Sequence, residues 1–261
     1  MTPQAAPCAA CGAALAGPYC SRCGQRVRPG RLTLRRVGID ALRQVTSLDR
    51  GLWRTLADLA RRPAGVAADY LRGATAPYVP PVRFFLVAVT AVQVAVFALG
   101  LAPGFAESFA EGLNEGRTAG ADVVDAQTVA DRMQRFWVVG LAGLVPFAVL
   151  WSRILFRRGG RTLAEHAVAH LYFLGAFVLA LGISVVGGHV IYDHVHETAG
   201  DVFSAVTLLG ALGLYVWSVA RTFGRGRWTG VAGALGVLLL TLAVYMAVWG
   251  FAAGVQSAHG A

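Results

Sequence analysis

Four cysteines near the N-terminus have the type and spacing needed to bind a metal ion. They form two Cys-x-x-Cys pairs with eight residues between them, and a glycine follows each pair. Two thiolates three positions apart can bind one face of a tetrahedral ion, and the glycine lets the backbone turn so that its N–H groups point at sulfur. We therefore predict a zinc ribbon over residues 1–28, with a structural zinc ion as cofactor. Its ligands are Cys8, Cys11, Cys20 and Cys23.

Two other roles of the cysteines, in redox chemistry or in a disulfide bond, would require different surroundings. A thioredoxin-like redox motif uses one Cys-x-x-Cys on a βαβ unit, and a disulfide pair requires an oxidising compartment. Residues 1–7 contain no basic residue and no apolar run, so we predict no secretory signal and a cytoplasmic start. Reduced thiols in the cytoplasm can hold zinc. The ribbon is expected to be a docking or folding module in preference to a nucleic-acid-binding one.

A second candidate polar site lies in the sequence LAEHAVAH, residues 163–170. His166 and His170 are four residues apart and share a helix face, as two metal ligands would. Glu165 precedes the first histidine, which differs from the His-Glu-x-x-His pattern of metalloproteases. Three interpretations stay open: an ion-paired helix start, metal or proton chemistry, and a polar contact between helices. The cations near the helix start are Arg157, Arg158 and Arg161.

A third stretch with metal-ligating side chains is HVIYDHVHE, residues 189–197. Neutral imidazoles and carboxylates suit zinc and similar metals. The alternative is a short solvated loop that binds metals weakly without a function. The side chains concerned are His189, Asp193, His194, His196 and Glu197.

The composition is that of a multi-span membrane protein. Hydrophobic residues make up 56% of the chain, charged residues 14%, and the mean hydropathy is +0.57, which together exclude an ordinary soluble globular class. With about 20 residues needed per crossing, we predict an all-α fold with a five-span bundle over residues 82–252 and a tail over 253–261. The predicted spans are 82–101, 136–156, 167–190, 203–221 and 230–252.

The charges are distributed unevenly about these spans. All 23 basic residues are arginine, and 20 of them fall in the N-terminal segment or in loops that successive spans place on the same side. The other side has three arginines and nine of the 14 acidic residues. This contrast follows the positive-inside rule and predicts a cytoplasmic N-terminus and a periplasmic or external C-terminus. It also accounts for the net charge of +9 without a nucleic-acid partner.

Residues 29–81 are predicted to form cytoplasmic amphipathic helices. Apolar residues recur at helical spacing over 34–48 and 52–59, with arginines on the other faces. These helices are expected to lie on anionic lipid at the cytoplasmic face or to pack on the ends of the spans. A short helix should follow over 66–72.

Three features of the predicted bundle concern its connections and packing. Pro80 and Pro81 should stop helical structure and set the angle at which the first span enters. Residues 102–135 are predicted to be an outer loop that contains a short amphipathic helix leading into the second span. A stripe of small residues in the third span predicts close packing within the bundle or a face for a homo-oligomer. The stripe is Ala176, Ala180, Ser184 and Gly188.

Four stretches of the chain together resemble a known family. They are the Cys-x-x-Cys-Gly ribbon, LDRGLWRTLADLARRPAGVAADYLRG, YVPPVRFFL and RTLAEHAVAHLYFL. From Cys8 to about Leu174 the chain resembles a widespread group of uncharacterised bacterial inner-membrane proteins, grouped as a domain of unknown function. The resemblance implies a bacterial inner (cytoplasmic) membrane location and carries no activity with it.

Three functions agree with these features. The first is a non-enzymatic scaffold or regulatory protein whose zinc ribbon docks a cytoplasmic protein partner. The second is a transporter or channel for a small solute or ion. The presence of Gln93 and Pro146 inside the predicted spans favours this function. The third is an intramembrane metal-dependent enzyme that uses Glu165, His166 and His170. We favour the first, and with it a protein that is not an enzyme.

Overall fold

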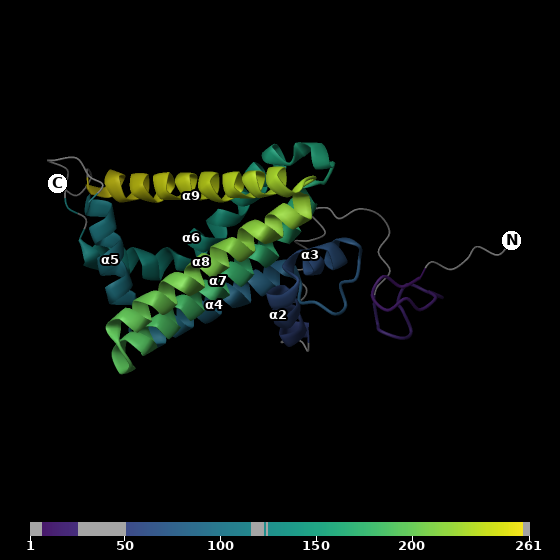
Figure 1. The fold of residues 1–261 in the computed structure, drawn as a ribbon, viewed down its shortest axis with the longest axis horizontal. Coiled ribbons are helices and arrows are strands. Elements are labelled where there is room, and N and C mark those ends of the chain that lie inside the picture. Colours follow the sequence, from purple (N-terminus) through teal and green to yellow (C-terminus); the bar gives the residue numbers. More distant parts are fainter. Residues whose placement is uncertain (1–6, 26–50, 116–122, 124, 258–261) are drawn as a thin grey trace.

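The structure confirms the all-α fold. It is a computed structural model that describes residues 7–25, 51–115, 123 and 125–257. These residues form helices and no strand, apart from one isolated bridge between Pro7 and Ala14 (Figure 1). The helices are α2 (Gly51–Arg61), α3 (Pro63–Leu71), α4 (Pro81–Ala98), α5 (Ala102–Glu115), α6 (Ala126–Leu155), the 3-10 helix η1 (Arg157–Gly159), α7 (Leu163–His194), α8 (Glu197–Phe223) and α9 (Arg227–Ser257).

Four helices are long and apolar enough to cross a membrane, namely α4, α7, α8 and the Arg227–Tyr245 part of α9. They correspond to the first, third, fourth and fifth predicted spans, so the chain is an integral membrane protein. The second predicted span, 136–156, coincides with the C-terminal part of α6. The apolar stretch found there, Gly140–Leu155, is shorter than 18 residues. Within the described residues, four of the five predicted spans are therefore long and apolar enough to cross a membrane.

The connecting segments agree with the sequence in part. α2 and α3 take the positions of the amphipathic helix predicted over 52–59 and of the short helix after it. The helix predicted over 34–48 lies outside the described residues. Residues 102–135 are not a simple loop, because they contain α5 as well as the predicted helix that leads into α6. Asp125 caps that second helix by accepting a hydrogen bond from Thr128 N at 3.0 Å.

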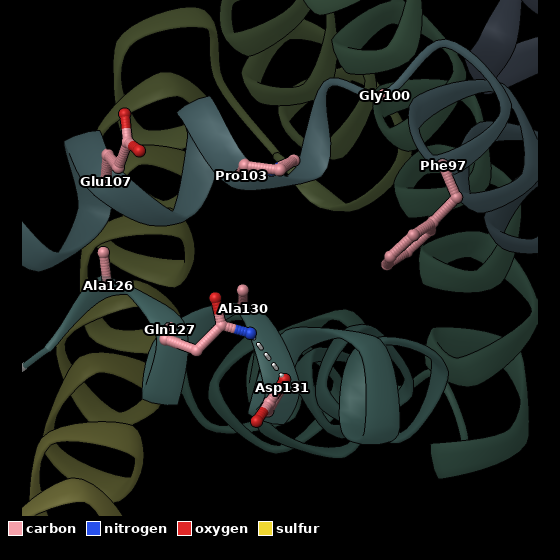
Figure 2. Close-up of a pocket in the computed structure, with 8 residues that line it drawn as sticks. All are labelled: Phe97, Gly100, Pro103, Glu107, Ala126, Gln127, Ala130 and Asp131. Carbon is pink, nitrogen blue, oxygen red and sulfur yellow. Dashed lines mark hydrogen bonds between the residues drawn. The ribbon is translucent and has the colours of Figure 1, made fainter.

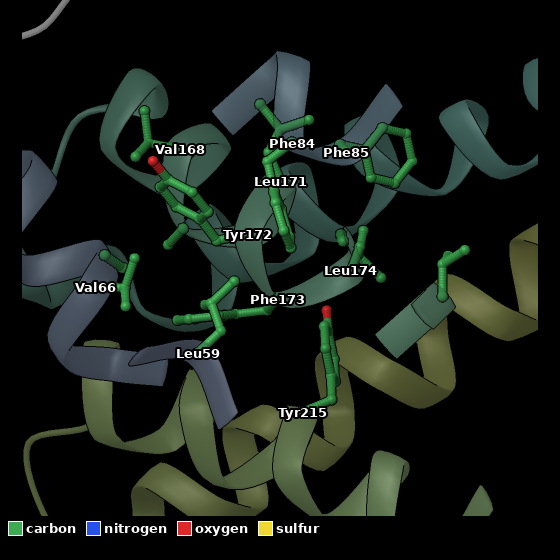
Figure 3. Packing of buried hydrophobic residues seen from close by; sticks show 14 of the residues in the cluster. Leu59, Val66, Phe84, Phe85, Val168, Leu171, Tyr172, Phe173, Leu174 and Tyr215 are labelled. Carbon is green, nitrogen blue, oxygen red and sulfur yellow. The ribbon is translucent and has the colours of Figure 1, made fainter. Parts of the chain in front are cut away.

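α7 lies at the centre of the bundle and packs against α4, α6 and α8, and also against α2 and α3. Tyr172 and Phe173 from α7, Phe84 from α4 and Tyr215 from α8 fill the core where these helices meet (Figure 3). Gly175 makes room for the aromatic ring of Phe84, because a Cβ at position 175 would lie 2.8 Å from Phe84 Cε1. Close helix packing of this kind is how small residues stabilise membrane bundles.

The small-residue stripe of α7 contacts α8 within the same chain. Ser184 Oγ donates to Ser204 O at 2.8 Å, and Ser204 Oγ donates to Ser184 O at 3.1 Å. A Cβ on Gly188 would lie 3.2 Å from Gly200 O and would collide with the Ser204 side chain. Ser184 and Gly188, two of the four stripe residues, therefore serve packing inside the bundle.

A buried peptide group at Val79 joins the N-terminal helices to the bundle. Val79 is 3% exposed and precedes Pro80 and Pro81, neither of which has an N–H. Its own N–H donates to Thr55 Oγ1 of α2 at 3.0 Å, and its carbonyl accepts from the Tyr172 hydroxyl of α7 at 2.6 Å. Buried backbone groups require such partners. The loop is thus fixed between α2 and α7, and Pro81 starts α4 from a defined position.

A polar network on Arg62 supports the same loop from its other side. The Arg62 guanidinium donates to Asp58 Oδ2 at 3.1 Å, to Asp69 Oδ2 at 3.0 Å and to the Tyr78 hydroxyl at 2.9 Å. The Tyr78 hydroxyl also lies 2.9 Å from Asp69 Oδ2. Burial of this hydroxyl, together with the neighbouring carboxylates, raises the pKa of Tyr78 to about 12, so the tyrosine is neutral at pH 7.

Removing either side-chain partner of Val79 should weaken the fold. Thr55→Val and Tyr172→Phe each leave a buried backbone group without its hydrogen bond, which costs about 1–3 kcal/mol of unfolding free energy. Chemical unfolding of the detergent-solubilised protein, followed by circular dichroism, measures the change. The matched controls are Thr90→Val and Tyr192→Phe, since both of these side chains are exposed. Equal losses in the controls and the two variants would contradict the anchoring role.

Candidate metal centre and buried polar site

The two Cys-x-x-Cys-Gly turns have the same backbone structure. Gly12 N donates to Cys8 O at 2.8 Å, and Gly24 N donates to Cys20 O at 2.9 Å. Both glycines have positive φ angles, 74° and 71°, in a region that other residues rarely adopt. The tight turns predicted from the two glycines are confirmed.

The four thiols converge on one point. Their sulfur atoms all lie within 4.8 Å of one another, and the Sγ–Sγ distance is 3.6 Å both for Cys8 with Cys23 and for Cys11 with Cys20. A tetrahedral ion with metal–sulfur bonds of about 2.3 Å separates its sulfur ligands by about 3.8 Å. The cysteine set therefore fits a metal ion, as the spacing in the sequence predicts.

The two cysteines of the second turn have pKa values shifted in opposite directions. N–H groups of Cys23 and Arg22 point toward the sulfur of Cys20 and lower the pKa of this thiol to about 6. A thiolate, and not a thiol, is the form of cysteine that binds metal ions. The backbone of Gln25 lowers the pKa of Cys23, but burial and the three neighbouring thiols outweigh it and raise this pKa to about 12.

Gln25, directly after the second turn, holds the N-terminal module on the rest of the protein. Its backbone carbonyl accepts from Cys20 N at 2.8 Å, so its position depends on the turn. Its side chain is 3% exposed, and it donates to Thr75 Oγ1 at 3.1 Å and accepts from Ala76 N at 2.7 Å. Thr75 and Ala76 belong to the loop that ends at Val79. The turn from Cys20 to Gly24 therefore places Gln25 where its side chain can form hydrogen bonds with this loop.

Glu165 is a helix cap. Its carboxylate accepts a hydrogen bond from Thr162 N at 2.9 Å, and Glu165 N donates to Thr162 Oγ1 at 3.3 Å. This reciprocal pair is a capping box that begins α7. The negative side chain also lies at the positive end of the helix dipole. The position of Glu165 thus favours the helix-start interpretation.

His166 and His170 lie in the core and link three helices. His166 Nδ1 is 2.6 Å from Ser152 Oγ of α6, and His170 Nδ1 is 3.1 Å from the Tyr215 hydroxyl of α8. Both imidazole rings stack on Phe223 of α8, with centroid distances of 4.2 Å and 5.8 Å. The two histidines are 1% and 0% exposed. Their surroundings favour the third interpretation, a polar contact between helices.

The three residues of the second candidate site do not meet at one point. Outside the N-terminal module, the described part of the chain contains no further group of three or more metal-ligating side chains close enough to share an ion. Glu165 points into its cap, while each histidine faces a hydroxyl group on another helix. His170 Nε2 is buried and makes no hydrogen bond with any described residue.

The stretch 189–197 forms a surface pair and a helix cap. His189 Nε2 lies 3.2 Å from Asp193 Oδ2, and both side chains are 44% exposed. His196 Nδ1 accepts from Thr198 N at 3.2 Å, which places His196 at the N-cap of α8. These contacts agree with the alternative of a solvated connection between α7 and α8.

A pocket of about 270 Å³ lies between the end of α4, α5 and the start of α6 (Figure 2). Phe97, Glu107, Gln127 and Asp131 contribute to its wall, and Gln127 Nε2 donates to Asp131 Oδ1 at 3.2 Å. Its two acidic side chains are exposed, and none of the residues predicted from the sequence as site residues lines it.

Comparison with known proteins gives one match. A family model described as "Protein of unknown function (DUF3667)" matches residues 49–92. This agrees with the resemblance to an uncharacterised family. No curated protein and no solved structure matches the chain. The matched segment contains the Arg62 network and the Val79 loop, that is, Thr55, Asp58, Arg62, Asp69, Tyr78 and Val79.

Several partners of the site residues were not predicted from the sequence. Gln25 follows Gly24 directly, and this adjacency to the metal turn is the one signal that points to it. Ser152, Tyr215 and Phe223 come from α6 and α8, and only the packing of these helices against α7 brings them to the histidines. No local pattern in the sequence identifies them.

Metal content should depend on the cysteines alone. Cys20→Ser with Cys23→Ser removes half of the ligand set, so the variant should lose the single metal ion that we expect per chain. A His166→Ala/His170→Ala variant should keep it, because neither histidine lies in the cysteine cluster. Elemental analysis of the purified protein gives the metal-to-protein ratio. Metal retained without the cysteines and lost without the histidines would contradict this assignment.

Removing the hydroxyl group that faces His166 should destabilise the bundle. Ser152→Ala leaves the buried Nδ1 of His166 without its partner, at a cost of about 1–3 kcal/mol. Ser218→Ala is a matched control, since Ser218 is 1% exposed and its hydroxyl donates to the backbone carbonyl of Leu214 in its own helix. Unfolding in detergent compares the two variants. If Ser218→Ala lowers the free energy of unfolding as much as Ser152→Ala does, the contact with His166 contributes no more to stability than an ordinary buried hydroxyl group.

Proposed function

We propose that this protein is a non-enzymatic scaffold or regulatory protein of a bacterial inner membrane, whose N-terminal zinc ribbon lies in the cytoplasm and docks a protein partner. The ribbon is residues 7–25 of the described chain. Zinc is the proposed metal because four thiolates in tetrahedral arrangement suit it and because a reducing cytoplasm keeps the thiols available.

One observation carries the proposal: the ribbon is anchored on one side and open on the other. Gln25 binds Thr75 and Ala76 on the membrane body, while Tyr19 is 58% exposed and Cys23 is also exposed. A surface held in a fixed orientation binds a partner with a smaller loss of conformational entropy. It also places that partner at a defined position beside the membrane. Both properties suit a docking module.

The proposed cytoplasmic position rests on charge. α2, α3 and the two arginine-rich turns, 153–161 and 221–227, gather at one end of the bundle (Figure 1). The acidic residues Glu107, Asp193 and Asp201 belong to α5, α7 and α8 near the connections at the other end. Arginine collects on the cytoplasmic side of membrane proteins. This supports a cytoplasmic ribbon.

The other two candidate functions gain less from the structure. Pro146 is exposed on α6, where lipid is expected, and Gln93 is half-buried on α4. An exposed proline removes one of the two residues that favoured a polar path for a transported solute. The positions of Glu165, His166 and His170 favour a cap and interhelical contacts, so they lend no support to an intramembrane enzyme.

Site-specific crosslinking tests the docking role. A photoreactive phenylalanine analogue at Tyr19 should capture a discrete protein in intact cells, and the crosslink should disappear in the Cys20→Ser/Cys23→Ser variant because the ribbon no longer folds around its metal. The control position is Tyr192, at the opposite end of the bundle and 43% exposed. It should give no such product.

The Gln25→Ala variant separates folding of the ribbon from its anchoring. It keeps the cysteine ligands but loses the contacts with Thr75 and Ala76, so metal content should stay the same while the crosslink at Tyr19 weakens. A crosslinked product that is unchanged in the cysteine variant would exclude the metal-dependent docking that we propose.

A further inference from the structure

Two groups of arginines at the ribbon end of the bundle differ in their partners. Arg54 and Arg62 pair with Asp58, and Arg62 and Arg72 pair with Asp69. In the described part of the chain, no ion pair includes an arginine from the α6–α7 or the α8–α9 connection. We call this second group the arginine rim; it comprises Arg153, Arg157, Arg158, Arg161, Arg221, Arg225 and Arg227.

The two connections that carry the rim lie side by side. The guanidinium of Arg161, just before α7, stacks 5.7 Å above the ring of Phe223 at the end of α8. The ring of Phe156, at the end of α6, lies 5.9 Å from the same phenylalanine, and it also contacts the start of α9 at Gly233. Two turns far apart in the sequence therefore bring their arginines to the same end of the bundle.

Exposed tryptophans border the rim. Trp228 is 78% exposed and Trp217 is 43% exposed. The guanidinium of Arg227 lies 5.7 Å above the ring of Trp228, and that of Arg221 lies 5.7 Å above the ring of Trp217. Tryptophan concentrates at the headgroup level of membranes, where its ring has apolar and polar neighbours. The rings mark the depth at which the rim meets the bilayer.

We infer that the arginine rim binds the headgroups of anionic phospholipids. Seven arginines at the ends of α6 to α9, none of them in an ion pair with a described acidic residue, give a positive surface at headgroup depth. Guanidinium groups bind phosphate oxygens through paired hydrogen bonds. Charge complementarity and continuity with the membrane-spanning helices both identify the bilayer surface as the occupant. The inference does not depend on the docking role of the ribbon.

This surface differs from the one that the sequence suggests. From the sequence, the amphipathic helices within residues 29–81 are the surface expected to lie on anionic lipid. In and beside α2 and α3, however, Arg54, Arg62 and Arg72 are paired with aspartates, which reduces the positive potential they offer to lipid. Arg61 is exposed there and forms no ion pair with a described residue. Most of the arginines that form no ion pair with a described residue lie on the α6–α7 and α8–α9 turns instead.

Lipid binding by the purified full-length protein tests the inference. Native mass spectrometry in a neutral detergent would count bound phosphatidylglycerol or phosphatidylcholine as each lipid is titrated. The wild-type protein should bind phosphatidylglycerol in preference, and this preference should shrink as salt increases. Arg221→Gln/Arg225→Gln/Arg227→Gln should weaken phosphatidylglycerol binding by roughly tenfold or more, with phosphatidylcholine binding unchanged.

A charge-matched control shows whether the position of the arginines matters. Arg22→Gln/Arg54→Gln/Arg61→Gln removes three exposed arginines outside the rim and should change phosphatidylglycerol binding less than twofold, about the limit of this measurement. Equal losses in the two triple variants would overturn the assignment to the rim. If the rim variant fails to fold, the lipid preference of the wild-type protein and its salt dependence still decide: equal binding of both lipids overturns the inference.

Two other anionic ligands are further outcomes of the test. Inorganic phosphate that displaces phosphatidylglycerol at equal concentration would identify a free-anion site in place of a lipid surface. An oligonucleotide or acidic peptide that binds the rim while phosphatidylglycerol does not would likewise overturn the inference.

Discussion

The peptide group of Val79 imposes the constraint on which the rest of the structure depends. Two prolines follow it, so the chain cannot continue a regular hydrogen-bonded structure there, yet the residue is buried. A buried peptide group needs partners, and α2 and α7 supply them through Thr55 and Tyr172. These two bonds fix the start of α4, the position of α2 and the N-terminal half of α7 relative to one another.

The same loop connects the metal centre to the membrane body. Gln25 binds Thr75 and Ala76 a few residues before Val79, and its own position follows from the turn around Cys20. A metal ion that orders the turn is thereby coupled to the loop through one side chain. The loop in turn rests on α7, whose histidines contact α6 and α8. The contacts at Val79 and at the two histidines join buried groups, and such contacts specify one arrangement of apolar helices, whereas the contact at Gln25 is partly exposed.

The features that could be predicted from the sequence are those with a local signal. The Cys-x-x-Cys-Gly spacing predicts the cluster of four thiols, hydropathy predicts the four membrane-length helices, and the two prolines predict the start of α4. Contacts between distant segments have no such signal, which is why Gln25 and Ser152 were missed. The three interpretations of Glu165, His166 and His170 could not be separated from the sequence, because they depend on which groups the neighbouring helices place opposite them. α5 was missed because its short, Gly-containing and acidic sequence resembles that of a loop.

Amide hydrogen exchange on either side of Pro77 tests the central claim, that metal binding orders the ribbon and thereby holds it on the Val79 loop. Mass spectrometry of the full-length protein would compare exchange with zinc bound and after chelation, using peptides that separate Ala76 from Val79. The account predicts that chelation speeds exchange at Ala76, which donates to Gln25, and leaves Val79 protected by Thr55. Exchange at Ala76 that is the same with and without zinc would contradict it.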